Sequence, residues 1–255
     1  MSLLATESLA VEIGGKRIGG ALDLAFGAGE TWAVLGANGV GKTTFLHTLA
    51  GLRPPTEGRV LLDHMALTGM RRRSIARRLG ILLQASEDPF PATVLETALI
   101  GRHPHLGPWQ WEGPSDHAAA RRALAEVELD ALASRAVDTL SGGERRRLAL
   151  ATLLTQDPSV YLLDEPSNHL DLHHQIQLLG RLRERVTERG GSLVMALHDV
   201  NLAARFCDHV VLIFHDGDVR HGPAAELLQP GHLSCLYHHP IRSVDVDGQR
   251  AFLPA

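Results

Sequence analysis

The sequence predicts an α/β fold built on a mostly parallel sheet, with an antiparallel sheet at one edge and an inserted helical subdomain. Short apolar runs of strand length alternate with longer helical patterns, which is typical of βαβ units. The segment through Phe26 is richer in glycine and alternates in polarity, which favours an antiparallel edge sheet. Between Ala85 and Pro158 no good strand pattern occurs and helical periods take over, so inserted helices are expected there.

The elements follow from these patterns in chain order. Strands of the parallel sheet are predicted at residues 31–35, 80–83, 160–163, 192–196 and 209–214. Helices of the core are predicted at residues 42–50, 171–189 and 199–206. In the inserted part, helical periods run through residues 94–101, 116–127 and 143–156, and a loop with two tryptophans covers residues 103–114.

We expect these elements to form one domain, with its core at residues 1–85 and 159–230. The helical subdomain is expected at residues 86–158. A short C-terminal extension, residues 231–255, is expected to hold a short helix and a small hairpin.

Bulk composition excludes several classes of protein. The net charge of -4 argues against a nucleic-acid-binding surface as the main function. The two cysteines, Cys207 and Cys235, are too few for a disulfide framework and fit a reducing compartment. The first residues lack a signal-peptide pattern, and no window of about 18 apolar residues occurs. We therefore expect a cytosolic chain, which can still dock on a membrane protein.

A glycine-rich motif lies between the strand predicted at residues 31–35 and the helix predicted from residue 42. It fits the pattern G-x-x-x-x-G-K-[ST] and comprises Gly36, Ala37, Asn38, Gly39, Val40, Gly41, Lys42 and Thr43, followed by Thr44. Its glycines let backbone N–H groups turn towards phosphates, and the helix adds its positive N-terminal end. Lys42 is expected to reach the β- and γ-phosphates, and Thr43 to bind Mg²⁺. The alternative, a glycine turn that binds nothing, is disfavoured by the strand–loop–helix context.

Two carboxylates end the apolar strand predicted at residues 160–163. In a parallel sheet the carboxyl ends of the strands face the ligand, so Asp164 and Glu165 are expected beside the phosphates. Asp164 suits Mg²⁺, and Glu165 is placed to polarise the attacking water. The alternative is a strand that ends in two exposed acids.

The pentapeptide Leu140-Ser141-Gly142-Gly143-Glu144, about twenty residues before Asp164, resembles the signature motif of ABC ATPases. The other motifs of that family occur in the family's order around it: Gln84 after a strand, the loop 167–171 and His198 after another strand. The resemblance covers nearly the whole chain and implies a P-loop, RecA-like ATPase core that uses ATP and Mg²⁺. It also implies a homodimer in which Ser141, Gly142 and Gly143 close on ATP held by the other subunit.

The resemblance assigns roles to three further residues. His198 matches the histidine that contacts the γ-phosphate and the attacking water. Gln84 matches the glutamine that touches Mg²⁺ and water and links the core to the helical subdomain. Asp171 is expected at the dimer interface near the partner's P-loop.

One feature departs from the family pattern. The family usually stacks adenine on an aromatic residue that precedes the P-loop, but no aromatic residue occurs in residues 1–25. Ile13, Arg17 or Ile18 could cover the ring instead, Arg17 by cation–π stacking.

Local motifs resemble the ATPases that import metal chelates, namely vitamin B12, ferric siderophores and haem. They lie at residues 89–96, 100–105 and 198–203. The resemblance implies a peripheral subunit on the cytoplasmic face of the inner membrane, working with a permease dimer and indirectly with a substrate-binding protein. Residues 84–102 are the expected permease socket, with Phe90 as an apolar contact, and the preferred cargo is cobalamin. The alternative functions are a soluble ABC ATPase that acts on nucleic acid or ribosomes, and a binding protein with an inactive site.

Overall fold

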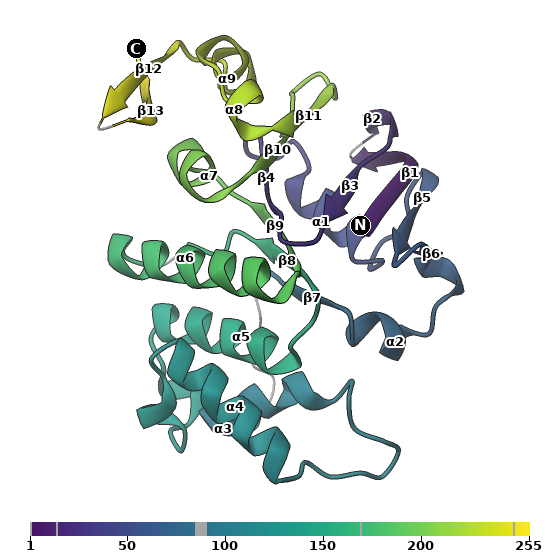
Figure 1. Cartoon of the computed structure of the whole chain (residues 1–255), viewed down its shortest axis with the longest axis vertical. Helices are drawn as coiled ribbons and strands as arrows, with labels where there is room; N and C mark the ends of the chain where they lie inside the picture. The colour runs from purple at the N-terminus through teal and green to yellow at the C-terminus, as the bar shows by residue number, and fades with distance from the viewer. Residues whose placement is uncertain (1, 14, 85–90, 169, 247) are drawn as a thin grey trace.

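The computed structural model describes residues 2–13, 15–84, 91–168, 170–246 and 248–255. Its central sheet has the strand order β11-β10-β4-β9-β8-β7 (Figure 1). The parallel strands are β4 (Thr31–Leu35), β7 (Leu79–Leu82), β8 (Val160–Asp164), β9 (Ser192–Ala196) and β10 (His209–Ile213). β11 (Val219–Pro223) pairs antiparallel with β10. All five predicted parallel strands are therefore present, within a residue at each end.

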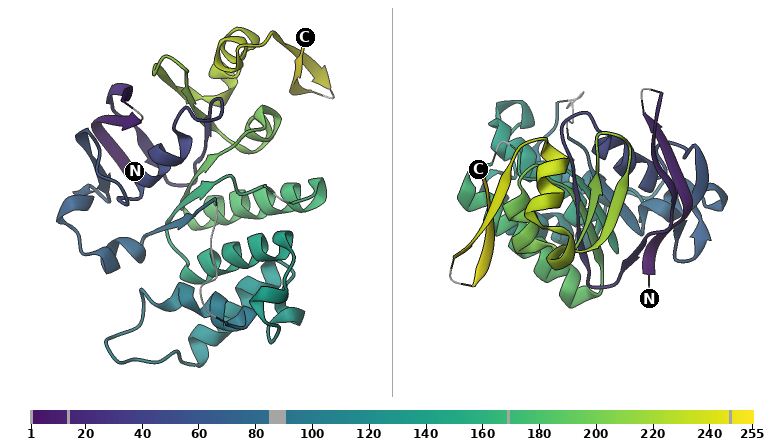
Figure 2. Two further views of the ribbon diagram at one scale, coloured as in Figure 1. Left: turned by 180° about the vertical axis from the view of Figure 1, so that it is seen from behind. Right: turned by 90° about the horizontal axis from the view of Figure 1, so that it is seen from above.

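An antiparallel sheet forms the edge predicted for the N-terminal segment. Its strands are β1 (Ser2–Ile13), β2 (Lys16–Leu22), β3 (Ala25–Gly27), β5 (Glu57–Leu62) and β6 (Met65–Ala66). β1 lies at its centre and pairs with β2, β3 and β5. Figure 2 shows this sheet standing beside the parallel sheet, on the side that carries α1 (Lys42–Leu49).

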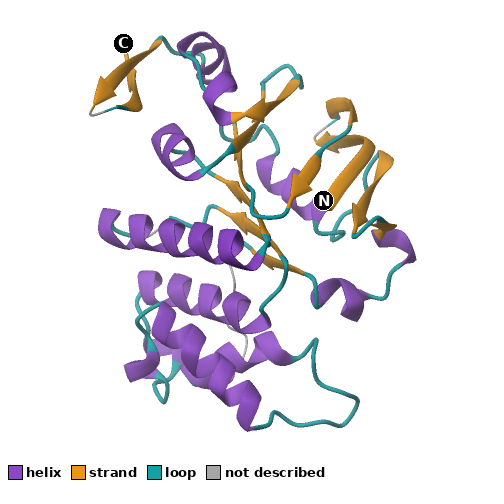
Figure 3. Cartoon of the chain, viewed as in Figure 1, coloured by secondary structure: helices purple, strands orange, loops and turns teal. Residues whose placement is uncertain are grey.

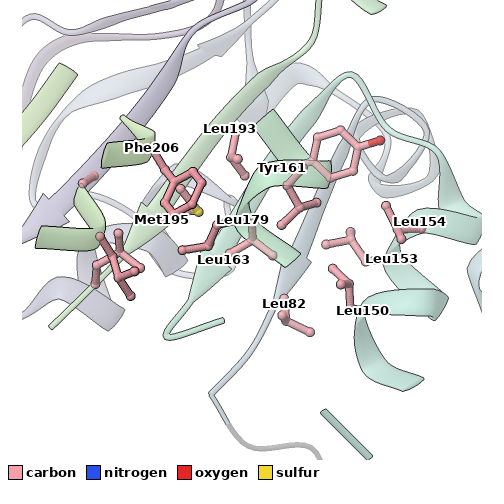
Figure 4. Packing of buried hydrophobic residues seen from close by; sticks show 14 of the residues in the cluster. Leu82, Leu150, Leu153, Leu154, Tyr161, Leu163, Leu179, Leu193, Met195 and Phe206 are labelled. Atoms are coloured by element: carbon pink, nitrogen blue, oxygen red, sulfur yellow. The ribbon is translucent and has the colours of Figure 1, made fainter. Parts of the chain in front are cut away.

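The parallel sheet separates two apolar cores because successive side chains of a strand point to opposite faces. In β8, Tyr161 and Leu163 belong to one cluster, and Val160 and Leu162 belong to the other. The first cluster is covered by α5 (Gly142–Gln156), α6 (Leu172–Arg189) and α7 (Val200–Phe206). Figure 4 shows Leu150, Leu153 and Leu179 from these helices pointing towards the side chains of β8 and β9. Burial on both faces explains why these strands are mostly apolar and do not alternate with polar residues.

Helices gather between β7 and β8 in the chain, as predicted for the inserted subdomain (Figure 3). They are α3 (Val94–Leu99), α4 (Pro114–Glu126) and α5, with short 3-10 turns at Ile100–Arg102, Asp130–Leu132 and Val137–Thr139. Thr93 caps α3 by accepting the backbone N–H of Glu96. The predicted helix 94–101 thus ends as an α-helix at Leu99 and continues as a 3-10 turn.

The remaining elements include the predicted C-terminal helix and hairpin. α9 (Pro230–Tyr237) precedes β12 (Ile241–Val246) and β13 (Gln249–Pro254). Shorter pieces are α2 (Arg72–Ala76), α8 (Ala224–Leu227) and a 3-10 turn at Leu67–Gly69. In the part of the chain that the structure describes, no helix has the length and apolar character needed to span a bilayer. The fold class predicted from the sequence is confirmed.

Candidate nucleotide site

The P-loop connects the end of β4 to the start of α1 and is closely packed from below. A Cβ on Gly36 would lie 2.6 Å from the carbonyl oxygen of Ile213. Gly41 has a φ of +110°, and a Cβ there would lie 2.0 Å from Cδ1 of Ile13. Glycine is strongly favoured at Gly41, because other residues rarely adopt this backbone conformation and a Cβ would also force the Ile13 side chain to move.

Lys42 begins α1 but turns its side chain back over the loop. Its Nζ donates hydrogen bonds to the carbonyl oxygens of Gly36 at 2.8 Å and Ala37 at 3.1 Å. Burial lowers the pKa of Lys42, while the nearby carboxylates of Glu165 and Asp164 act in the opposite direction. The ammonium group is thus held in the loop and faces the two acids at the end of β8.

Glu165 is the centre of a polar cluster formed by three loops. Gln84, after β7, donates its Nε2 to Oε2 of Glu165 at 3.0 Å. Asn168 donates to the same oxygen, and Nε2 of His198, after β9, contacts Oε1. Glu165 has a φ of +50°, which is unusual for a residue other than glycine, and its backbone N–H bonds the Ala196 carbonyl at 3.1 Å. The carboxylate is therefore fixed from three sides.

Asp164 is completely buried, and neither of its carboxylate oxygens has a hydrogen-bond partner among the described residues. An ionised carboxylate without a partner is costly in a protein interior. Such a group suits a divalent cation that takes oxygen ligands. Asp164 and the Thr43 hydroxyl are thus side chains that could hold Mg²⁺, and Thr43 and Gln84 line one common cleft, which Asp164 does not line.

A buried arginine that the sequence analysis missed connects the signature helix to these strand ends. Arg146, on α5, donates to the carbonyl oxygens of Leu83 and Asp164, and to that of Glu165 at 2.8 Å. Burial lowers its pKa, against the opposite effect of Asp164 and Glu165. The burial of Arg146 could have been inferred from its spacing in α5. It lies four residues before the buried Leu150 and seven before Leu153, and therefore on the same face of the helix.

An open cleft of about 510 Å³ brings most of the predicted residues together. It is lined by Ile13, Asn38, Gly39, Gly41, Lys42, Thr43, Thr44, Gln84, Glu165 and His198. Gly36, Ala37 and Val40 belong to the same loop, although they do not line the cleft. The sequence analysis also did not predict the contact of Asn168 with Glu165. Its position in the loop 167–171, shortly after Glu165, could have suggested this contact.

The signature residues are outside this cleft. Ser141 caps α5, accepting the N–H of Glu144 at 3.3 Å, while its own N–H donates to the Glu144 carboxylate at 2.7 Å. Gly142 and Gly143 form the first turn. Asp171 caps α6 by accepting the N–H of His174 at 2.9 Å, and it does not line the cleft either.

The three candidates for covering adenine have different environments. Ile13 lines the cleft, whereas Ile18 is buried beneath Gly41. The guanidinium of Arg17 is paired with the Glu57 carboxylate by two hydrogen bonds, the longer of 3.0 Å. Ile13 is therefore the best placed of the three. The expected permease contact Phe90 lies outside the described residues.

Transport ATP-binding proteins are similar to this chain over most of its length. The chain is 35% identical over 244 residues to the achromobactin transport ATP-binding protein of Dickeya dadantii, covering 96% of this chain and 91% of the relative. It is 36% identical over 209 residues to the ferric enterobactin transport ATP-binding protein of Escherichia coli, covering 82% and 77%.

Solved structures are similar over most of the chain. An inward-facing ABC transporter of metal-chelate type matches with a TM-score of 0.86 and 25% identity, covering 100% of this chain and 98% of that one. A dimeric bacterial ABC transporter cassette matches with a TM-score of 0.74 and 25% identity, covering 87% and 98%. A sequence model described as ABC transporter matches residues 20–168. The chain therefore belongs to the ABC transporter family, as one of its ATP-binding, ATP-hydrolysing proteins.

Proposed function

We propose that this chain energises the import of a metal chelate, with an iron chelate such as a ferric siderophore as the preferred cargo. The relatives that transport achromobactin and ferric enterobactin and the neighbour of metal-chelate type support this cargo class. None of them supports cobalamin in particular. The chain would work at the cytoplasmic face of the membrane, bound to a permease dimer that receives cargo from a substrate-binding protein.

The cluster around Glu165 carries the proposed mechanism. ATP binds with its phosphates in the P-loop, where Lys42 exchanges its bonds to Gly36 and Ala37 for phosphate oxygens. Thr43, Asp164 and Gln84 would hold Mg²⁺, and the ion would supply positive charge to offset the negative charge that develops on the phosphates. Glu165 accepts a proton from the attacking water, and Gln84, Asn168 and His198 hold its carboxylate in place for this.

The separation of two features proposed to bind anions supports a homodimer. The cleft contains the P-loop and Glu165, but Ser141, Gly142 and Gly143 do not line it. The N-terminus of α5 is a positive helix end with free backbone donors, which suits a phosphate. In our proposal the partner subunit supplies this helix end to each cleft, and Asp171 lies at the interface. The dimeric cassette among the similar structures supports this arrangement.

The central test is the Glu165→Gln variant. Glutamine keeps the size of the side chain and its hydrogen bonds but cannot accept the proton, so ATP should bind and stay intact. We expect hydrolysis to fall by about 100-fold or more and an ATP-dependent dimer to accumulate, measured by phosphate release and by light scattering. Glu188→Gln, at an exposed position of α6, is the matched control. Wild-type hydrolysis by Glu165→Gln would rule out Glu165 as the base.

The proposed permease contact is an exposed surface of apolar side chains beside basic residues of α2. Trp109 is 99% exposed and Trp111 is 86% exposed, and Leu52 and Ile100 are at least half exposed. The elements that carry them are joined by α2, because Arg72 donates to the Gly51 carbonyl and Arg73 to the Pro104 carbonyl at 2.9 Å. Large exposed apolar groups of this kind mark interaction sites.

This contact is tested by co-purification from membranes of the host organism. A tagged Trp109→Ala/Trp111→Ala variant should lose the permease that accompanies the wild-type chain, while its basal ATP hydrolysis stays unchanged. Trp32→Phe, at a buried position, is the control for tryptophan replacement. Equal recovery of permease by the double variant would contradict the proposed surface, and recovery of nucleic acid or ribosomes in its place would contradict the importer.

A further inference from the structure

The C-terminal hairpin is attached to the helix that follows the proposed catalytic histidine. Its strand β13 lies beside α7 (Figure 1). The Asn201 side chain, on α7, accepts the backbone N–H of Phe252 at 2.7 Å and donates to the carbonyl of the same residue at 3.2 Å. The side-chain amide of Asn201 thus satisfies both backbone groups of Phe252, as a residue of a neighbouring strand would. The Phe252 ring is 4% exposed and belongs to the main apolar cluster.

Asn201 is also part of the short turn that contains His198. Asp199 caps α7 by accepting the N–H groups of Asn201 at 2.7 Å and Leu202 at 3.4 Å. His198 precedes this cap directly and contacts Glu165. A shift of the N-terminal turn of α7 would therefore move the imidazole relative to the Glu165 carboxylate.

A second residue of the C-terminal extension, Tyr237, lies close enough to Asp199 for the charge of that carboxylate to act on it. Tyr237, the last residue of α9, packs against the main apolar cluster. Burial and the nearby Asp199 carboxylate raise its pKa to about 12. The Ser234 hydroxyl, also on α9, accepts the N–H of Ile241 at 2.9 Å and so fixes the start of the hairpin.

The hairpin contacts α7 through β13 and α9 through β12, but part of it borders open space. An open cavity of about 900 Å³ lies between it and α7–α8, and Asp245 and Arg250 line that cavity. Figure 2 shows the hairpin at the periphery of the molecule, away from the parallel sheet. The Val246 side chain is 56% exposed and Leu253 is 41% exposed, so the outer part of the hairpin is accessible.

We propose that the hairpin is a positioning element for His198, acting through the pairing of Asn201 with Phe252 at the start of α7. Asn201 is a positioning residue, because it touches neither the P-loop cleft nor Glu165. Displacement of the hairpin slows ATP hydrolysis and leaves ATP binding intact, since Lys42 and Ile13 are unaffected. This inference rests on the proposed role of His198 in hydrolysis.

The test compares four variants of the full chain in steady-state ATP hydrolysis. Asn201→Ala removes both hydrogen bonds to the Phe252 backbone, whereas Phe252→Ala keeps that backbone and removes the buried ring that packs in the main apolar cluster. Each variant should lower kcat by about three- to ten-fold, with KM for ATP unchanged. Asn201→Asp keeps the acceptor for the Phe252 N–H and should restore part of the loss. Arg242→Ala, at an exposed position of β12, is the matched control and should behave as wild type.

Hydrogen exchange separates positioning from general destabilisation. In Asn201→Ala, exchange should rise at the amide of Phe252 and at the start of α7, while β8 and α1 keep their protection. Unchanged kcat in both alanine variants, with wild-type hydrolysis measurable, would overturn the inference. A fall in kcat accompanied by an equal loss of protection in β8 would also overturn it. If wild type itself did not hydrolyse ATP, the proposed function would fail instead.

Discussion

The P-loop cleft and the start of α5 are the two regions proposed to bind anions, and they are built in opposite ways. In the cleft, the functional groups come from distant segments: Lys42 follows β4, Gln84 follows β7, Glu165 follows β8 and His198 follows β9. At α5 they come from one short stretch, in which Ser141 and Glu144 satisfy each other. The cleft therefore depends on the whole sheet, whereas the α5 end depends on one capped turn.

The difference also concerns charge and exposure. Lys42, Asp164 and Glu165 are all less than a tenth exposed, so their charges interact strongly with one another and with any ligand. Ser141 and Glu144 lie at the surface. The buried cluster is proposed to bind the phosphates on one side, and the exposed helix end can donate hydrogen bonds to them from the other side. This is why the two regions fit a site shared between subunits.

The largest expected effect comes from Lys42→Ala, which removes the cation from the cleft and leaves Asp164 and Glu165 facing each other. We expect ATP affinity to fall by about 100-fold or more, in line with the loss of a buried charged contact of about 3–5 kcal/mol. Titration with a fluorescent ATP analogue measures this. A variant that kept its affinity would show that the P-loop backbone alone binds the phosphates.

A mixing experiment tests whether the two regions serve one site. Ser141→Arg should bind ATP and fail to hydrolyse it, and Lys42→Ala should fail to bind. Together they can form a mixed dimer that has one cleft with an intact P-loop and an intact α5 end. Hydrolysis should then recover to about a quarter of the wild-type rate, because half of the dimers are mixed and half of their sites are intact.

The control for the mixing experiment is each variant alone at the same total concentration, which should stay inactive. Pull-down with two different tags verifies that mixed dimers form. Verified mixed dimers without any hydrolysis would contradict a site shared in this way.

Arg146 connects the two regions, because it lies on α5 and bonds carbonyl groups at the ends of β7 and β8. Its removal leaves the carbonyls of Leu83, Asp164 and Glu165 without their donor in a buried place. Arg146→Ala should lower the free energy of unfolding by about 2–4 kcal/mol and reduce kcat more than ATP affinity. Urea unfolding and hydrolysis assays measure both, with Arg122→Ala at an exposed position of α4 as control. Wild-type stability would mean that Arg146 does not hold α5 to the strand ends.

Sequence reasoning reached the parallel strands and the P-loop because both follow local rules. The strands are mostly apolar, since α5, α6 and α7 cover one face of the sheet and α1 with the antiparallel sheet covers the other. The P-loop glycine spacing depends on one close turn at Gly41. Glu165 was predicted from its place after an apolar strand. Its left-handed backbone was not, because no local pattern requires it.

Contacts between segments that are distant in the chain could not be predicted from the sequence. Arg146 meets the carbonyls of Leu83 and Glu165 only after α5 packs across β7 and β8, so its role depends on tertiary structure. The same is true of Asn201, whose partner Phe252 lies fifty-one residues further along the chain. The position of Arg146 on the buried face of α5 could have indicated a structural role. Nothing in the sequence around Asn201 indicated its contact with Phe252.

The smallest expected effect concerns the cap of α5 and shows how independent this region is of the cleft. The backbone N–H of Ser141 bonds the Glu144 carboxylate and lowers its pKa below the usual 4.5. The ionised form is therefore favoured in the folded chain, which stabilises it above pH 4.5 and is lost as the pH falls through the lowered pKa. Glu144→Gln should lower the melting temperature by about 1–2 °C at pH 7, and this gap should narrow as the pH falls below 4.5. Melting curves of the wild-type and Glu144→Gln chains on both sides of pH 4.5 measure this difference, with Glu188→Gln as control. A difference in melting temperature that stayed constant with pH would show that the carboxylate charge does not stabilise the cap.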